Sequence, residues 1–146
     1  MSEANTRVDF YILEASETLA RLRFACRLAE KAYGLSHSIH AHVESDADAR
    51  RFDELLWTFK PGSFLPHEVL QAKTSPEAPI TIGTESSGRP SADLLINLGN
   101  SDSCITEGFD RIAEIIDGSE QGRQVGRTRF KAYRDAGFEP QTHQIG

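Results

Sequence analysis

Short, apolar, strand-like segments separated by amphipathic stretches are the feature that most constrains how this chain can fold. Residues 8–13 (VDFYIL) are nearly continuous in apolar character, and residues 93–98 (DLLINL) form the clearest strand pattern in the chain. Near-continuous apolar strands of this length are typical of parallel sheets, in which helices cover both faces. The alternation of strands and helices predicts an α/β protein with a Rossmann-like, mainly parallel sheet covered by helices in a single domain.

The predicted elements follow one another along most of the chain. Strands are expected over residues 8–13, 38–43, 80–82, 93–98 and 112–116, and helices over residues 17–33, 47–59 and 121–136. Ser16 is the expected N-cap of the first helix, and Ser45 or Asp46 that of the second. Residues 105–109 favour a short helix, although one helix over 104–117 fits the pattern equally well. The expected domain spans residues 1–138, followed by a C-terminal tail over 139–146.

The composition indicates a globular protein of the cell interior. The chain has 146 residues, of which 38% are hydrophobic and 26% charged, enough for one domain with its own core. No apolar run approaches the roughly 20 residues that span a bilayer, and the N-terminus lacks a signal pattern, so we expect a cytoplasmic protein without membrane contact. Cys26 and Cys104 lack zinc-binding spacing and are expected to be buried thiols.

An aromatic stretch follows the second predicted helix, over residues 53–67. One apolar stripe of the helix contains Phe52, Leu55, Leu56 and Phe59. Trp57 projects about 140° away from Phe52 and lies outside that stripe. Phe64 follows in a loop stiffened by Pro61 and Pro66, because proline fixes φ. Trp57 and Phe64 therefore either complete the core from its far side or anchor a protein interface, and both interpretations stay open.

Cofactor motifs are absent from the sequence. It contains no GxGxxG or GxxxxGK[ST] pattern, and the loop 83–88 is only a weak candidate for binding phosphate. The best candidate metal ligands are His37, His40 and His42, because histidines two residues apart share one face of a strand, but no further ligand lies nearby. His67 is expected to be structural. We therefore expect no cofactor and no metal, with a nucleotide- or metal-dependent enzyme as the alternative.

The last predicted helix has a basic face. Its members, which fall within an arc of about 100°, are Arg123, Arg127, Phe130, Lys131 and Arg134. Val125, Ala132 and Ala136 lie opposite and are expected to pack on the sheet. The face is either simply solvated or binds a partner. An acidic peptide with a hydrophobic end fits better than nucleic acid, because the whole chain has a net charge of −6; direct binding of single-stranded DNA remains an alternative.

Several motifs resemble one known family, the chi subunit of the bacterial DNA polymerase III holoenzyme. They are Phe10-Tyr11, Leu55 with Trp57, Ser63-Phe64 before Pro66-His67, the strand around Asp93-Leu94-Leu95-Ile96 with Leu98, and the closing pattern RxRxKAYRxxGF over residues 127–138. The likeness extends along nearly the whole chain. Together these motifs are specific, although each alone is weak.

The resemblance implies a non-enzymatic accessory subunit of Rossmann-like fold. It implies binding to psi of the clamp-loader complex and to the acidic, phenylalanine-ended C-terminal tail of the single-stranded DNA-binding protein, with DNA reached only indirectly. The resemblance assigns tail binding to Arg127 and Lys131. Phe130 stands where the family has a tyrosine, and Arg123 stands where the family can have a lysine. The psi-binding role carries to Trp57 and Phe64, with Pro66 beside them.

Overall fold

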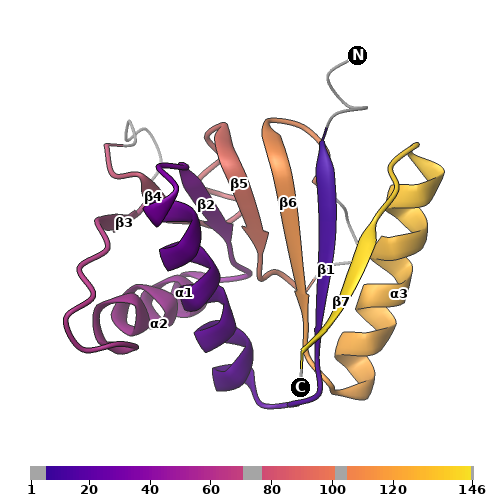
Figure 1. The fold of residues 1–146 in the computed structure, drawn as a ribbon, viewed down its shortest axis with the longest axis horizontal. Coiled ribbons are helices and arrows are strands. Elements are labelled where there is room, and N and C mark those ends of the chain that lie inside the picture. The colour runs from indigo at the N-terminus through magenta and orange to yellow at the C-terminus, as the bar shows by residue number, and fades with distance from the viewer. Residues whose placement is uncertain (1–5, 71–76, 101–104, 146) are drawn as a thin grey trace.

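A computed structural model of the chain describes residues 6–70, 77–100 and 105–145. The described residues form one seven-stranded sheet with the order β3-β4-β2-β5-β6-β1-β7, and every neighbouring pair is parallel (Figure 1). The elements are β1 (Arg7–Leu13), α1 (Thr18–Gly34), β2 (Ile39–His42), α2 (Asp46–Thr58), β3 (His67–Val69), β4 (Ile80–Gly83), β5 (Ala92–Asn97), β6 (Phe109–Ile116), α3 (Glu120–Asp135) and β7 (Gln141–Ile145). The predicted fold class, an α/β protein with a Rossmann-like parallel sheet, is confirmed.

The sheet has a hydrophobic core on each face. Successive side chains of a strand point to opposite faces, so Leu13 of β1 packs in the core under α1 and α2 while Phe10 packs in the core under α3. Figure 1 shows α1 and α2 in front of one side of the sheet and α3 beside the β1–β7 edge. Among the described residues, no helix is both long and apolar enough to cross a membrane.

The predicted apolar stripe of α2 is confirmed. Phe52 and Leu56 are fully buried, and Leu55 and Phe59 pack against the same core. Ser45 caps the helix, because its hydroxyl accepts a hydrogen bond from the backbone N–H of Asp48 at 3.1 Å. The other expected cap is wrong: α1 begins after Glu17, whose side chain makes no capping hydrogen bond, and Ser16 lies one residue outside.

Two edge strands and one loop differ from the prediction. Residues 141–145, expected to lie in a tail, form β7 and pair with β1, and residues 67–69 form β3 beside β4. The short helix expected over residues 105–109 is absent, and β6 begins at Phe109. Both edge strands are short and only partly buried, so their pairing with a neighbouring strand, rather than an apolar pattern of their own, determines their structure.

The buried face of α3 also differs from the prediction. Its buried residues are Gly126, Arg129 and Tyr133, whereas Ala136, which was expected to pack on the sheet, is exposed. A side chain added at Gly126 would meet Ile116 at 3.2 Å, so glycine lets the helix approach β6 closely. An arginine is tolerated on this face because a carboxylate of the sheet lies opposite it.

Candidate functional site

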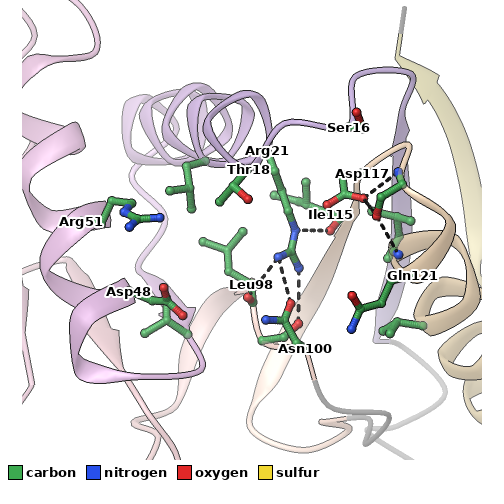
Figure 2. A pocket seen from close by; sticks show the side chains of 17 residues that line it. Ser16, Thr18, Arg21, Asp48, Arg51, Leu98, Asn100, Ile115, Asp117 and Gln121 are labelled. Atoms are coloured by element: carbon green, nitrogen blue, oxygen red, sulfur yellow. Dashed lines mark hydrogen bonds between the residues drawn. The ribbon is translucent and has the colours of Figure 1, made fainter.

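The first candidate site is a crevice of about 360 Å³ outside the carboxyl ends of the strands, where open parallel sheets commonly bind ligands. It lies where the chain leaves β1 for α1 on one face and β6 for α3 on the other. Arg21 of α1 occupies its centre (Figure 2). The Arg21 guanidinium donates hydrogen bonds to the backbone oxygens of Ile115 at 2.8 Å and of Leu98 and Gly99 at 3.3 Å. Arg21 therefore ties the ends of β5 and β6 together.

The start of α3, beside this crevice, uses its own side chains to satisfy its backbone donors. The Asp117 carboxylate accepts from the N–H of Ser119 at 2.9 Å, and the Ser119 hydroxyl accepts from the N–H of Gly122 at 2.9 Å. A phosphate group binds a helix N-terminus through free N–H groups and is repelled by a carboxylate. The geometry of this helix start therefore favours a structural role.

The three histidines suggested as metal ligands are separated by the fold. His40 and His42 share one face of β2, as the two-residue spacing predicted. Both are buried, whereas His37 is exposed before the strand. His40 Nδ1 lies 2.7 Å from the Thr81 hydroxyl. Burial lowers the pKa of His40 to about 3, and that of His42 is lowered for the same reason. Within the described residues, no group of three or more His, Cys, Asp or Glu side chains could hold a metal ion.

The second candidate site is a hollow between α3 and the β1–β7 edge, which we call the α3 pocket. It encloses about 360 Å³, and its lining comprises Phe10, Ile12, Ile116, Arg123, Gly126, Arg127, Phe130 and Gln144. The Phe10 and Phe130 rings lie 5.4 Å apart, and both pack in the core under α3. Arg123 and Arg127 are exposed on the helix one turn apart. Neither guanidinium group forms an ion pair among the described residues. An apolar, aromatic floor beside two exposed guanidinium groups can hold a ring and a carboxylate together.

The structure brings three of the five predicted basic-face residues together in the α3 pocket: Arg123, Arg127 and Phe130. Lys131 and Arg134 are exposed but do not line it. Lys131 Nζ donates to the Asp135 carboxylate at 2.9 Å, one turn along the helix. Such an exposed pair contributes little to stability, about 0.3–0.5 kcal/mol.

Arg129 and Tyr133, two residues of the closing sequence pattern, belong to a buried polar network. The Arg129 guanidinium donates to the Glu114 carboxylate of β6 at 2.8 Å and to the Gly99 backbone oxygen at 2.9 Å. The Tyr133 hydroxyl and the Asn97 amide also donate to Glu114, at 2.7 and 3.0 Å. Glu114 and Arg129 are both fully buried. This network fixes α3 on the sheet and so positions the pocket on the neighbouring face of the helix.

The third candidate site is the aromatic surface at the β3 edge. Trp57 is 56% exposed and Phe64 is 81% exposed, so neither completes the core. The Trp57 ring lies 4.5 Å from the ring of His67. His67 Nδ1 lies 2.6 Å from the backbone oxygen of Leu65 and Nε2 lies 3.1 Å from that of Asp53, which confirms the expected structural role of His67. Pro66 is exposed in the same loop.

Fold and sites together define a class: an α/β protein whose parallel sheet carries an aromatic surface at one edge and a basic pocket at the other. The sequence profile of the family described as "DNA polymerase III chi subunit, HolC" matches residues 5–141. The chain belongs to this family, and the predicted resemblance is confirmed.

Curated relatives support the assignment. The DNA polymerase III subunit chi of Pseudomonas aeruginosa is 36% identical over 96% of this chain and 97% of its own. That of Haemophilus influenzae is 31% identical over 94% and 96%. Among solved structures, the C-terminal domain of the DEAD-box protein Dbp5 has a TM-score of 0.62 at 12% identity, covering 96% of this chain and 91% of that chain. This last likeness shows a shared fold only.

Sequence reasoning missed the sheet side of the α3 pocket. Phe10 and Ile12 were assigned to a strand but not to a site, and Gln144 was placed in the tail. A signal was present in the alternation of the first strand, since Phe10 and Ile12 point to the same face. The sequence does not show that α3 packs against that face and forms the pocket with it; the folded structure does.

Proposed function

We propose that the chain is a non-catalytic accessory subunit of DNA polymerase III that links the replicase to the acidic C-terminal tail of the single-stranded DNA-binding protein. The family assignment supports the replicase part of this proposal. The observation that carries the tail-binding part is the α3 pocket, which combines exposed guanidinium groups with an aromatic floor. In this role the protein is a cytoplasmic adaptor between proteins, and it reaches DNA only through its partners.

The chemistry of the α3 pocket suits a peptide that ends in phenylalanine. The terminal ring packs against Phe10 and Phe130, and the terminal carboxylate pairs with Arg127 and Arg123. Hydrogen bonds to charged groups contribute about 1.5–3 kcal/mol each, and one buried aromatic ring contributes a similar amount. Ordering the peptide offsets part of this gain, so the expected dissociation constant is in the micromolar range.

Lys131 and Arg134 have a weaker part in the proposal. They lie on the same exposed face of α3 but outside the pocket lining. Aspartates upstream of the terminal phenylalanine are attracted to them through solvent, where salt screens the interaction. We therefore expect binding to weaken as the salt concentration rises, with Arg127 contributing more than either residue.

The test is calorimetry with a peptide that ends in several aspartates and a phenylalanine with a free carboxylate. We expect binding to the wild-type protein at low salt and at least tenfold weaker binding to Arg127→Ala. Arg50→Ala is the matched control, because Arg50 is an exposed arginine on α2, away from the pocket. Absence of binding at low salt, or equal binding by wild type and Arg127→Ala, would refute the tail-binding assignment.

The aromatic surface is the proposed contact for psi in the clamp-loader complex. Exposed Trp57, Phe64 and Pro66 supply rigid apolar anchors of the kind that dominate protein interfaces. This surface and the α3 pocket lie at opposite edges of the sheet, so the two proposed sites do not overlap. Co-purification with psi tests the assignment: Trp57→Ala should lose psi while Arg127→Ala retains it, and retention of psi by Trp57→Ala/Phe64→Ala would contradict the proposal.

A further inference from the structure

A second basic hollow lies on the opposite face of β1 from the α3 pocket. We call it the α1 groove; it encloses about 230 Å³ and is lined by Tyr11, Phe24, Arg27, Leu28, Lys31, Ala32, Leu35 and Arg111. Phe10 and Tyr11 are neighbours in β1 and therefore point into the α3 pocket and the α1 groove respectively. The two hollows share no lining residue.

The cations on the helix side of the α1 groove have no carboxylate partner. Arg27 and Lys31 are both exposed and lie one turn apart on α1, so their side chains are neighbours. Across the part of the chain that the structure describes, neither forms an ion pair. Like charges at this spacing repel each other, and an acidic ligand would relieve that repulsion.

The carboxylate beneath the groove is already neutralised. Asp9 is fully buried, and Arg111 and Arg7 donate to its Oδ2 at 3.0 and 2.9 Å. His143 Nε2 lies 2.9 Å from its Oδ1. Burial by itself would raise the pKa of Asp9, but hydrogen bonds from His143, Arg7 and Arg111 outweigh burial and lower it. Asp9 therefore organises the sheet side of the groove without offsetting Arg27 or Lys31.

The apolar part of the groove suits an inserted side chain better than a stacked base. The Arg27 guanidinium lies 5.8 Å above the Phe24 ring, and the Tyr11 ring stacks on His143 with centroids 4.9 Å apart. Single-stranded nucleic acids stack their bases on free aromatic faces, and here both rings already have a partner. Leu35, which is 61% exposed, adds an apolar wall that a peptide side chain can cover.

We infer that the α1 groove is a second peptide-binding site, which takes an acidic segment with one large apolar residue inside it. The apolar side chain enters between Phe24 and Leu35, and flanking carboxylates pair with Arg27 and Lys31, since Arg111 is already paired with Asp9. This inference goes beyond the proposed function, because it assigns a different surface to a ligand that needs no free C-terminus.

The test uses a blocked peptide, N-acetylated and C-terminally amidated, with one leucine between two runs of three aspartates. Calorimetry and NMR chemical-shift mapping of the full chain at low salt should show binding at the α1 groove. Arg27→Ala/Lys31→Ala should weaken binding at least tenfold. Arg23→Ala, which removes an exposed arginine of the same helix outside the groove, should change it less than twofold, as should Arg127→Ala.

Three results would overturn the inference. The first is absence of binding at low salt by a protein whose circular dichroism shows it to be folded. The second is loss of binding in Arg127→Ala, because the blocked peptide would then occupy the α3 pocket. The third is displacement of the peptide by oligo(dT), with chemical-shift changes at the α1 groove, because the groove would then bind nucleic acid. Failure of the phenylalanine-ended peptide to bind would count against the proposed function alone.

Discussion

The buried pair of Arg129 and Glu114 gives the sharpest prediction for stability. Arg129→Ala leaves the Glu114 carboxylate, fully buried in the wild type, without its charged partner and leaves the Gly99 oxygen without that donor. Removing one member of a buried ion pair destabilises a protein by about 3–5 kcal/mol. A domain of this size has a free energy of unfolding of about 5–15 kcal/mol, so the variant should lose a large part of it.

Urea denaturation followed by far-UV circular dichroism measures this loss. With a slope of about 2 kcal/mol per molar urea, the midpoint should fall by about 2 M. Arg134→Ala is the matched control, because Arg134 is an exposed arginine of the same helix, and its free energy of unfolding should stay within about 0.5 kcal/mol of the wild type.

A double-mutant cycle tests whether Arg129 and Glu114 stabilise each other in the folded protein. Replacing both partners, as in Glu114→Met/Arg129→Met, removes the unpaired buried charge that each single variant leaves behind. We therefore expect the double variant to be about 2–3 kcal/mol more stable than the summed losses of the single variants Glu114→Met and Arg129→Met predict. Additive losses, or equal midpoints for Arg129→Ala and Arg134→Ala, would show that the pair does not couple α3 to the sheet.

Two further predictions concern stability. The low pKa of His40, about 3 in the folded chain against 6.5 unfolded, means that the unfolded chain binds an extra proton as the pH falls through this window. The free energy of unfolding should therefore drop by about 2 kcal/mol between pH 7 and pH 5. Urea denaturation at both pH values should show a smaller drop for His40→Gln, and an equal drop would contradict the role given to His40. Gly118→Ala should cost about 1–3 kcal/mol, because the added Cβ would lie 2.2 Å from the backbone oxygen of Glu14, whereas Gly34→Ala has open space and should leave the midpoint unchanged or higher.

The apolar strands could be predicted from the sequence because their local pattern and their tertiary environment agree. Residues 8–13, 93–98 and 112–116 are covered on both faces, so each shows a strong apolar run. The edge strands could not, because β7 (QTHQI) carries mostly polar, exposed side chains. Its partner β1 lies more than a hundred residues earlier in the chain, and no local pattern reports that contact.

Of the α3 pocket, the helix side could be predicted from the sequence and the sheet side could not. Helical geometry brought Arg123, Arg127 and Phe130 to one face of α3, and the structure places all three at the pocket. The same geometry assigned the wrong packing face, because a helical projection does not show that an arginine meets a buried carboxylate. Glu114 of β6 is what allows Arg129 to be buried, and only the packed structure brings the two together.

The position of β1 between β6 and β7 has a consequence for how the protein is made. Among the described residues, β1 pairs with β6 and β7, and its partner residues lie more than a hundred positions later in the chain (Arg7 with Arg111, Asp9 with Gln141), so β1 has no partner strand until those residues are made. Pairings of such long sequence separation slow folding, because the entropy of closing a large loop is lost before any contact forms. Until β6 has been made, the apolar run 8–13 lacks its partner strand, and unpaired apolar strands of this kind favour aggregation.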